Sequence, residues 1–109
     1  MRKWENELAR YVELCTQEAE ARATLENYDN TKSTVIALAM REAEKAGHKS
    51  AAAQRREADA SEAYVQWCLE RFAAAKVFHG AHLRRLAAEV WFGMARSEES
   101  SRRAEMQLQ

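Results

Sequence analysis

Proline is absent from this 109-residue sequence, and glycine occurs only three times. Proline and glycine are the two residues that most disfavour a helix interior, so long helices can form over most of the chain. There are only two cysteines, Cys15 and Cys68, which is too few for the disulfide framework of a small secreted domain. We therefore expect both thiols to be free and the protein to be cytoplasmic.

The sequence also lacks an excess of charge and any long apolar run. Its 17 basic and 17 acidic residues cancel, which argues against a simple polyanion binder. No apolar segment follows Arg2 and Lys3, and none approaches the roughly 20 residues that a membrane-spanning helix needs. We expect neither a signal peptide nor contact with a membrane.

Alanine is the residue that is abundant, with 22 copies. It has the highest helix propensity, and no segment shows the alternation of apolar and polar residues that is typical of a strand. The sequence therefore predicts an all-α fold.

Gly47-His48-Lys49-Ser50 is the clearest interruption of the helical pattern. Glycine favours the left-handed conformation that ends a helix, and serine is a common first cap of the next one. We predict a single helical-hairpin domain over residues 1–109, with helices over 2–46 and 51–97, a turn at 47–50 and a polar tail over 98–109. The polar segment 29–33 leaves open a break that would give three helices, although a continuous helix is favoured.

The second predicted helix carries apolar residues on more than one face. One partner helix covers only one face, so the chain needs further helices that a second copy would supply. We predict a long antiparallel hairpin that self-associates, most simply as a homodimer forming a four-helix bundle. The residues predicted to form the oligomer interface are Tyr64, Trp67, Phe72, Phe78, Leu83, Leu86, Val90, Trp91 and Met94.

His79-x-x-His82 is the only spacing that suggests a metal. With a turn at residues 48 and 49, facing residues of the hairpin have numbers that add to about 97. Glu18 then faces His79 and Cys15 faces His82, which would bring together four acceptable zinc ligands. The competing interpretation, two histidines at a helix seam that contact Glu18 or water, is preferred, and no metal is predicted.

Basic residues are unevenly distributed and suggest contact with nucleic acid. The first 29 residues carry a net charge of −3, whereas residues 30–60 carry +2. Such clusters can bind phosphates without reading base sequence. The candidates are Arg41, Lys45, Lys49, Arg55, Arg56, Arg84 and Arg85. The alternative is that they pair with the acidic first helix of another copy.

Signals of catalysis are missing from the sequence. It contains no glycine-rich phosphate loop, no nucleophile elbow and no paired carboxylates in an obvious cleft. We expect the protein not to be an enzyme and to use no cofactor.

Four features occur together in this sequence: a long amino-terminal helix, the turn at Gly47, the run from Tyr64-x-x-Trp67 to Ala74, and the closing Ala95-Arg96-Ser97-x-x-Ser100-x-Arg102-Arg103-Ala104. On these features the chain resembles small all-helical proteins of unknown function that are encoded in phage genomes and prophages near recombination and replication genes. The resemblance implies an accessory role in phage DNA recombination or replication in a bacterial host cell, with DNA or a DNA-metabolism protein as partner. The alternatives are a protein-interaction module without nucleic-acid contact and a metal-binding helical bundle.

Overall fold

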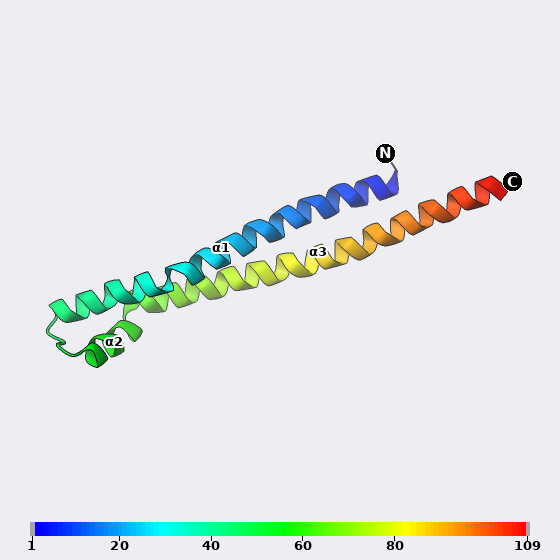
Figure 1. Cartoon of the computed structure of the whole chain (residues 1–109). Coiled ribbons are helices and arrows are strands. Elements are labelled where there is room, and N and C mark those ends of the chain that lie inside the picture. Colours follow the sequence, from blue (N-terminus) through cyan, green and yellow to red (C-terminus); the bar gives the residue numbers. More distant parts are fainter. Residues whose placement is uncertain (1, 109) are drawn as a thin grey trace. The chain divides into compact units, whose positions relative to one another are not determined.

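The computed structural model describes residues 2–108, and its regular structure is helical throughout that range. Three helices follow one another: α1 (Lys3–Lys45), α2 (Ala51–Asp59) and α3 (Glu62–Leu108). The predicted all-α fold and the antiparallel pairing of two long helices are confirmed (Figure 1).

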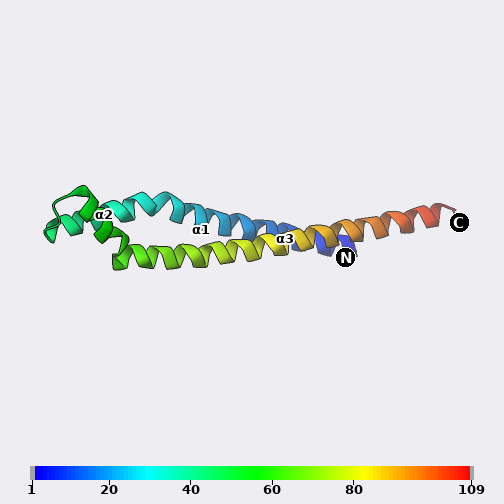
Figure 2. The same ribbon diagram turned by 90° about the horizontal axis from the view of Figure 1, so that it is seen from below.

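The chain divides into two compact units, each containing part of α1 and part of α3. One unit consists of residues 2–21 and 77–108, and the other of residues 22–76. In the second unit, α2 forms part of the connection between the long helices, as both views show (Figures 1 and 2). Within residues 2–108, no helix is both long enough and apolar enough to span a membrane.

Helix α1 begins and ends within one residue of its predicted bounds and does not break at residues 29–33. The polar side chains there form hydrogen bonds without interrupting the helix. The Thr31 hydroxyl donates to the Tyr28 carbonyl oxygen at 3.0 Å, and the Asp29 carboxylate accepts from Arg71 on α3. A continuous helix is therefore the correct interpretation of this segment.

The predicted turn is present and uses the expected residues. Gly47 has a φ of 106°, in the left-handed region that glycine adopts most easily, and the next amide, His48 N, donates to Ala43 O at 3.1 Å. Ser50 Oγ accepts from Ala53 N at 3.1 Å and so caps α2. Both local signals in the sequence were sufficient to locate this connection.

The prediction of a single helix over residues 51–97 is wrong, because one helix ends at Asp59 and the next begins at Glu62. Ser61 is the physical reason. Its hydroxyl donates to Ala58 O at 2.7 Å and accepts from Tyr64 N at 3.2 Å, so it caps the start of α3. Ala58 is completely buried at this corner.

The polar tail expected from residue 98 onward also differs, since α3 continues to Leu108. Charged pairs one turn apart stabilise this end: Arg102 and Arg103 lie 3.8 Å and 3.5 Å from the carboxylate of Glu99. This mostly polar segment therefore remains helical, with ion pairs between residues one turn apart.

The seam between the long helices is built from alanine. On α3 the buried apolar residues recur every seven positions, at Trp67, Ala74, Ala81, Ala88 and Ala95. A seven-residue repeat keeps one side of a helix against its partner, and the small alanine side chain lets the two axes approach closely. The buried apolar residues of α1 are Leu14, Ala21, Ile36 and Ala43.

The pairing register is one helical turn away from the predicted one. Glu18 pairs with His82, Asp29 with Arg71, and Lys3 with Glu98, so the numbers of paired residues add to 100 or 101 rather than 97. The error arose because the connection between the long helices is not a four-residue turn but contains α2.

The alanine seam predicts a specific intolerance of larger side chains. Ala88 is 2 % exposed, and Ala88→Leu should lower the free energy of unfolding by about 1–3 kcal/mol because the helices must move apart. Ala19→Leu, at an exposed position of α1, should change it by less than about 0.5 kcal/mol. Urea unfolding followed by circular dichroism measures both, and equal effects would contradict close packing at Ala88.

Candidate self-association surface

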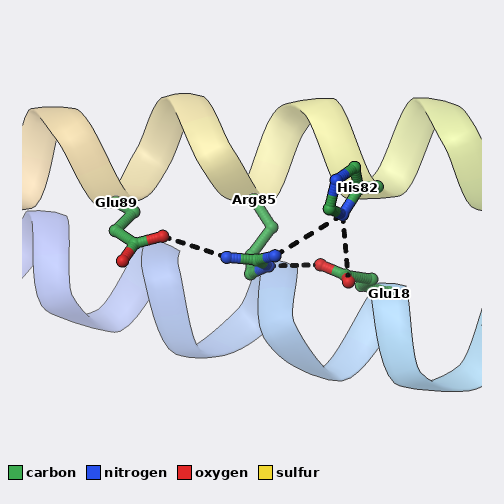
Figure 3. A network of polar contacts seen from close by, with 4 residues as sticks. All are labelled: Glu18, His82, Arg85 and Glu89. Carbon is green, nitrogen blue, oxygen red and sulfur yellow. Dashed lines mark hydrogen bonds and ion pairs between the residues drawn. The ribbon is translucent and has the colours of Figure 1, made fainter.

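A polar network crosses the seam and fixes which side of α3 faces α1. Glu18 of α1 lies between His82 and Arg85 of α3, and Arg85 also contacts Glu89 (Figure 3). Arg85 Nε donates to Glu18 Oε2, while Arg85 Nη1 donates to Glu89 Oε2 at 3.0 Å. His82 Nδ1 lies 3.3 Å from Glu18 Oε1.

Glu18 is the only buried charged residue in the described part of the chain, with 5 % of its surface exposed. A buried carboxylate is costly unless it is paired and hydrogen-bonded. The hydrogen bond from Arg85 lowers the pKa of Glu18, and His82 adds to this effect, although burial opposes it. The same contact raises the pKa of Arg85. Both groups are therefore charged at neutral pH, and a shift in register would separate them.

The network predicts how stability depends on pH. Because the pKa of Glu18 is lowered by folding, its contribution is complete above the ordinary carboxyl value of 4.5 and is lost as the pH falls through the lowered pKa. Glu18→Gln should therefore lower the thermal midpoint by several degrees at pH 7, and the difference from the unmodified protein should shrink towards pH 3. Thermal unfolding followed by circular dichroism measures this, with exposed Glu26→Gln as control. Equal midpoints for the two variants at pH 7 would contradict the assignment.

The residues proposed as metal candidates are not brought together. His82 contacts Glu18, but Cys15 is hydrogen-bonded to Tyr11, whose pKa it raises, and His79 is exposed. Among residues 2–108 there is no group of three or more His, Cys, Asp or Glu side chains that could hold a metal ion. The register places Glu18 one turn further along α3 than the prediction assumed, between His82 and Arg85.

The nucleic-acid candidates fall into three groups. Three of them are held by acidic neighbours: Lys45 by Glu42, Arg55 by Asp59, and Arg85 by Glu18 and Glu89. The guanidinium of Arg84 lies against Gly80, 3.2 Å from where a Cβ would stand. The other three are exposed and form no ion pair within the described residues: Arg41, Lys49 and Arg56.

The predicted oligomer interface also separates into two groups. Trp67 is 8 % exposed and its indole nitrogen donates to Tyr28 O of α1 at 3.0 Å, so it belongs to the hairpin itself and not to an outer surface. Tyr64 stacks on Trp67 with ring centroids 5.7 Å apart, and Phe78 is half-buried. The remaining predicted residues are exposed: Phe72, Leu83, Leu86, Val90, Trp91 and Met94.

These exposed residues extend into a regular stripe along α3, which we call the outer stripe. It consists of Val65, Leu69, Phe72, Leu83, Leu86, Val90 and Met94, which are between 39 % and 64 % exposed. Most neighbours in this set are three or four residues apart, so they share one side of the helix. At 100° per residue this side lies nearly opposite the alanine seam. Val77 and Trp91 are also exposed, and they lie on the side of α3 between the stripe and the alanine seam.

Helix α1 has no comparable surface. Eleven of the thirteen exposed large apolar side chains in the described part of the chain belong to α3, and only Val12 and Leu38 belong to α1. The asymmetry follows from the alanine seam, because the small residues of α3 face α1 and leave its larger residues outside.

Comparison of the chain with protein-family models, with curated proteins and with solved structures finds no match. The outer stripe of α3 and the exposed cations of α1, α2 and the turn between them are the features of the molecule that bear on function.

Proposed function

We propose that this chain is a non-enzymatic helical scaffold or adaptor that self-associates through the outer stripe of α3. The supporting observation is the exposure of seven large apolar side chains along one side of a single helix. Soluble monomers rarely expose contiguous apolar surface of this kind, and such surfaces usually bind another protein.

The energy available at this surface is sufficient to drive association. Complete burial of a Val, Leu, Phe or Met side chain contributes about 1.5–3 kcal/mol, so covering the exposed part of each stripe residue contributes roughly 1–2 kcal/mol. Leu69, Leu83 and Val90 are each 60–64 % exposed and stand to gain most. The alanine seam buries much less apolar area per residue within one hairpin. The outer stripe therefore offers more apolar area for burial than the seam does.

The outer stripe has the width that one covering helix needs. It spans about 100° of the circumference of α3 at 100° per residue, and a helix that contacts a single partner needs a stripe of about that width. Trp91 and Val77 widen the exposed apolar surface towards α1, to about 180° in all. One helix of a second copy therefore covers the outer stripe, and the two hairpins of such a homodimer together contribute four helices.

Self-association through α3 predicts different outcomes for two matched valines. Val90 and Val12 are 61 % and 55 % exposed, but only Val90 lies in the outer stripe. Val90→Glu should weaken association at least tenfold, because a charge would be buried at the interface, whereas Val12→Glu should not. Sedimentation equilibrium of both variants measures this. Equal association of the two variants would refute the assignment of the surface.

We extend this proposal to an accessory role in phage DNA recombination or replication, where the scaffold would contact nucleic acid. The resemblance to phage-encoded helical proteins supports this role, as do the unpaired cations Arg41, Lys49 and Arg56. All three belong to the unit formed by residues 22–76. The alternative is a protein-interaction module that does not bind nucleic acid.

The DNA-binding proposal predicts salt-sensitive binding that depends on these cations. Each cation that contacts a phosphate should reduce the slope of log K against log salt by about 1 when it is removed. Arg41→Gln combined with Arg56→Gln should therefore reduce the slope by about 2, whereas Arg10→Gln should not alter it. Fluorescence anisotropy with labelled single- and double-stranded DNA measures this. Absence of binding at low salt would leave the protein-interaction alternative.

A further inference from the structure

We infer that the outer stripe of α3 is a two-fold seam on which α3 of a second copy lies antiparallel. In this pairing Leu69 faces Leu86 of the partner and Phe72 faces its Leu83. The inference rests on the proposed function, since it specifies how the self-associating surface is used.

Within the described residues, α3 is the best available partner for itself. Outside α3, the only large exposed apolar side chains among these residues are Val12 and Leu38, and they do not form a stripe. The outer stripe thus has one extended apolar counterpart in the chain, which is the same stripe on another copy. An interface in which the same patch serves both copies is the ordinary arrangement of a two-fold dimer.

The order of residues along the stripe is compatible with pairing to an antiparallel copy. Between Val65 and Val90, positions three or four apart on this side of α3 are Val65, Leu69, Phe72, Lys76, His79, Leu83, Leu86 and Val90, and Met94 extends the stripe beyond this segment. The order is nearly the same when read from either end, with a valine and a leucine at each end and the two polar residues in the middle. Two identical helices crossing antiparallel about residues 77 and 78 would match each member with one of its own kind.

This match fixes the register. Antiparallel pairing with partner numbers that add to 155 places valine opposite valine, leucine opposite leucine, and Lys76 opposite His79. A shift by one seven-residue repeat places Phe72 against Lys76, or Leu83 against His79, so each polar side chain loses its polar neighbour and faces an apolar one. Burying a polar group without a partner is unfavourable, which selects the unshifted register.

The parallel alternative is disfavoured by charge. Parallel pairing in register would place Lys76 against the same lysine of the partner, in the centre of the seam. Like charges brought together in this way destabilise the pair. In the hairpin the Lys76 ammonium lies 5.6 Å from the centre of the Phe72 ring, so it is already packed along the stripe at the centre of the proposed contact.

Small residues lie along one edge of the stripe. Ala73, Gly80 and Ala87 recur every seven residues along one of its edges. A Cβ at Gly80 would meet only the flexible guanidinium of Arg84, so packing against α1 does not require glycine there. Small residues on this edge allow a second helix axis to approach closely.

Spin labels test the direction and register of this pairing. Arg84 and Glu98 lie on the same side of α3, two repeats apart, and each is replaced by a labelled cysteine in the full chain carrying Cys15→Ser and Cys68→Ser. Two-fold antiparallel pairing predicts axial separations between like labels of about 20 Å at residue 84 and about 62 Å at residue 98, from 1.5 Å per residue. Parallel pairing predicts one short distance for both.

Dipolar spectroscopy of the two singly labelled proteins gives these distances. Finding the unequal pair would support the inference. Equal distances, or distances that fit contact between α3 and α1 of the partner, would overturn the inference while the proposed self-association stands. Absence of dipolar coupling in samples that sediment as monomers would overturn both.

A charge exchange provides a second test that retains both native cysteines. Leu69→Glu combined with Leu86→Lys places opposite charges face to face twice in the proposed dimer, whereas Leu69→Glu combined with Leu83→Lys does not. The first double variant should associate at least tenfold more tightly than the second, a coupling typical of close interfacial charge pairs. Equal dissociation constants in sedimentation equilibrium would overturn the register.

Discussion

Close approach of α3 to α1 through alanine is the constraint on which the rest of the structure depends. Every seventh residue of α3 from Ala74 to Ala95 is alanine, and each is buried. A seam of small residues stabilises the hairpin through close van der Waals contact between the two helices rather than through a large buried apolar area. The consequence is that the large apolar side chains of α3 cannot lie in this seam, so they project from the opposite side.

Polar contacts then fix the register that the alanines leave free. A row of identical small residues packs almost equally well when it slides by a repeat, but the buried carboxylate of Glu18 finds Arg85 and His82 only in one position. Asp29 and Arg71 form an ion pair between the two helices within the other unit, at a more exposed position. The alanines thus allow the two helices to pack closely, and these charged residues fix the register in which they pair.

The fold class, the turn at Gly47 and the bounds of α1 could be predicted because each has a local cause in the sequence. The break at Ser61 was missed because it depends on one hydroxyl that caps α3 in an otherwise alanine-rich, helix-favouring segment. Because of that omission the predicted register was wrong by one helical turn, and Glu18 was placed opposite His79 instead of beside His82 and Arg85. The seven-residue spacing of alanines was visible in the sequence and would have separated Trp67, on the inner seam, from Leu83 and Val90 on the outer stripe.

Among the described residues only α3 carries an extended exposed apolar surface, and the proposed scaffold role depends on a second copy covering it. The most direct measurement is the mass of the unmodified protein in solution at micromolar concentration, by sedimentation equilibrium. The account predicts twice the chain mass of 12.5 kDa. A folded, helical particle of 12.5 kDa under the same conditions would contradict it.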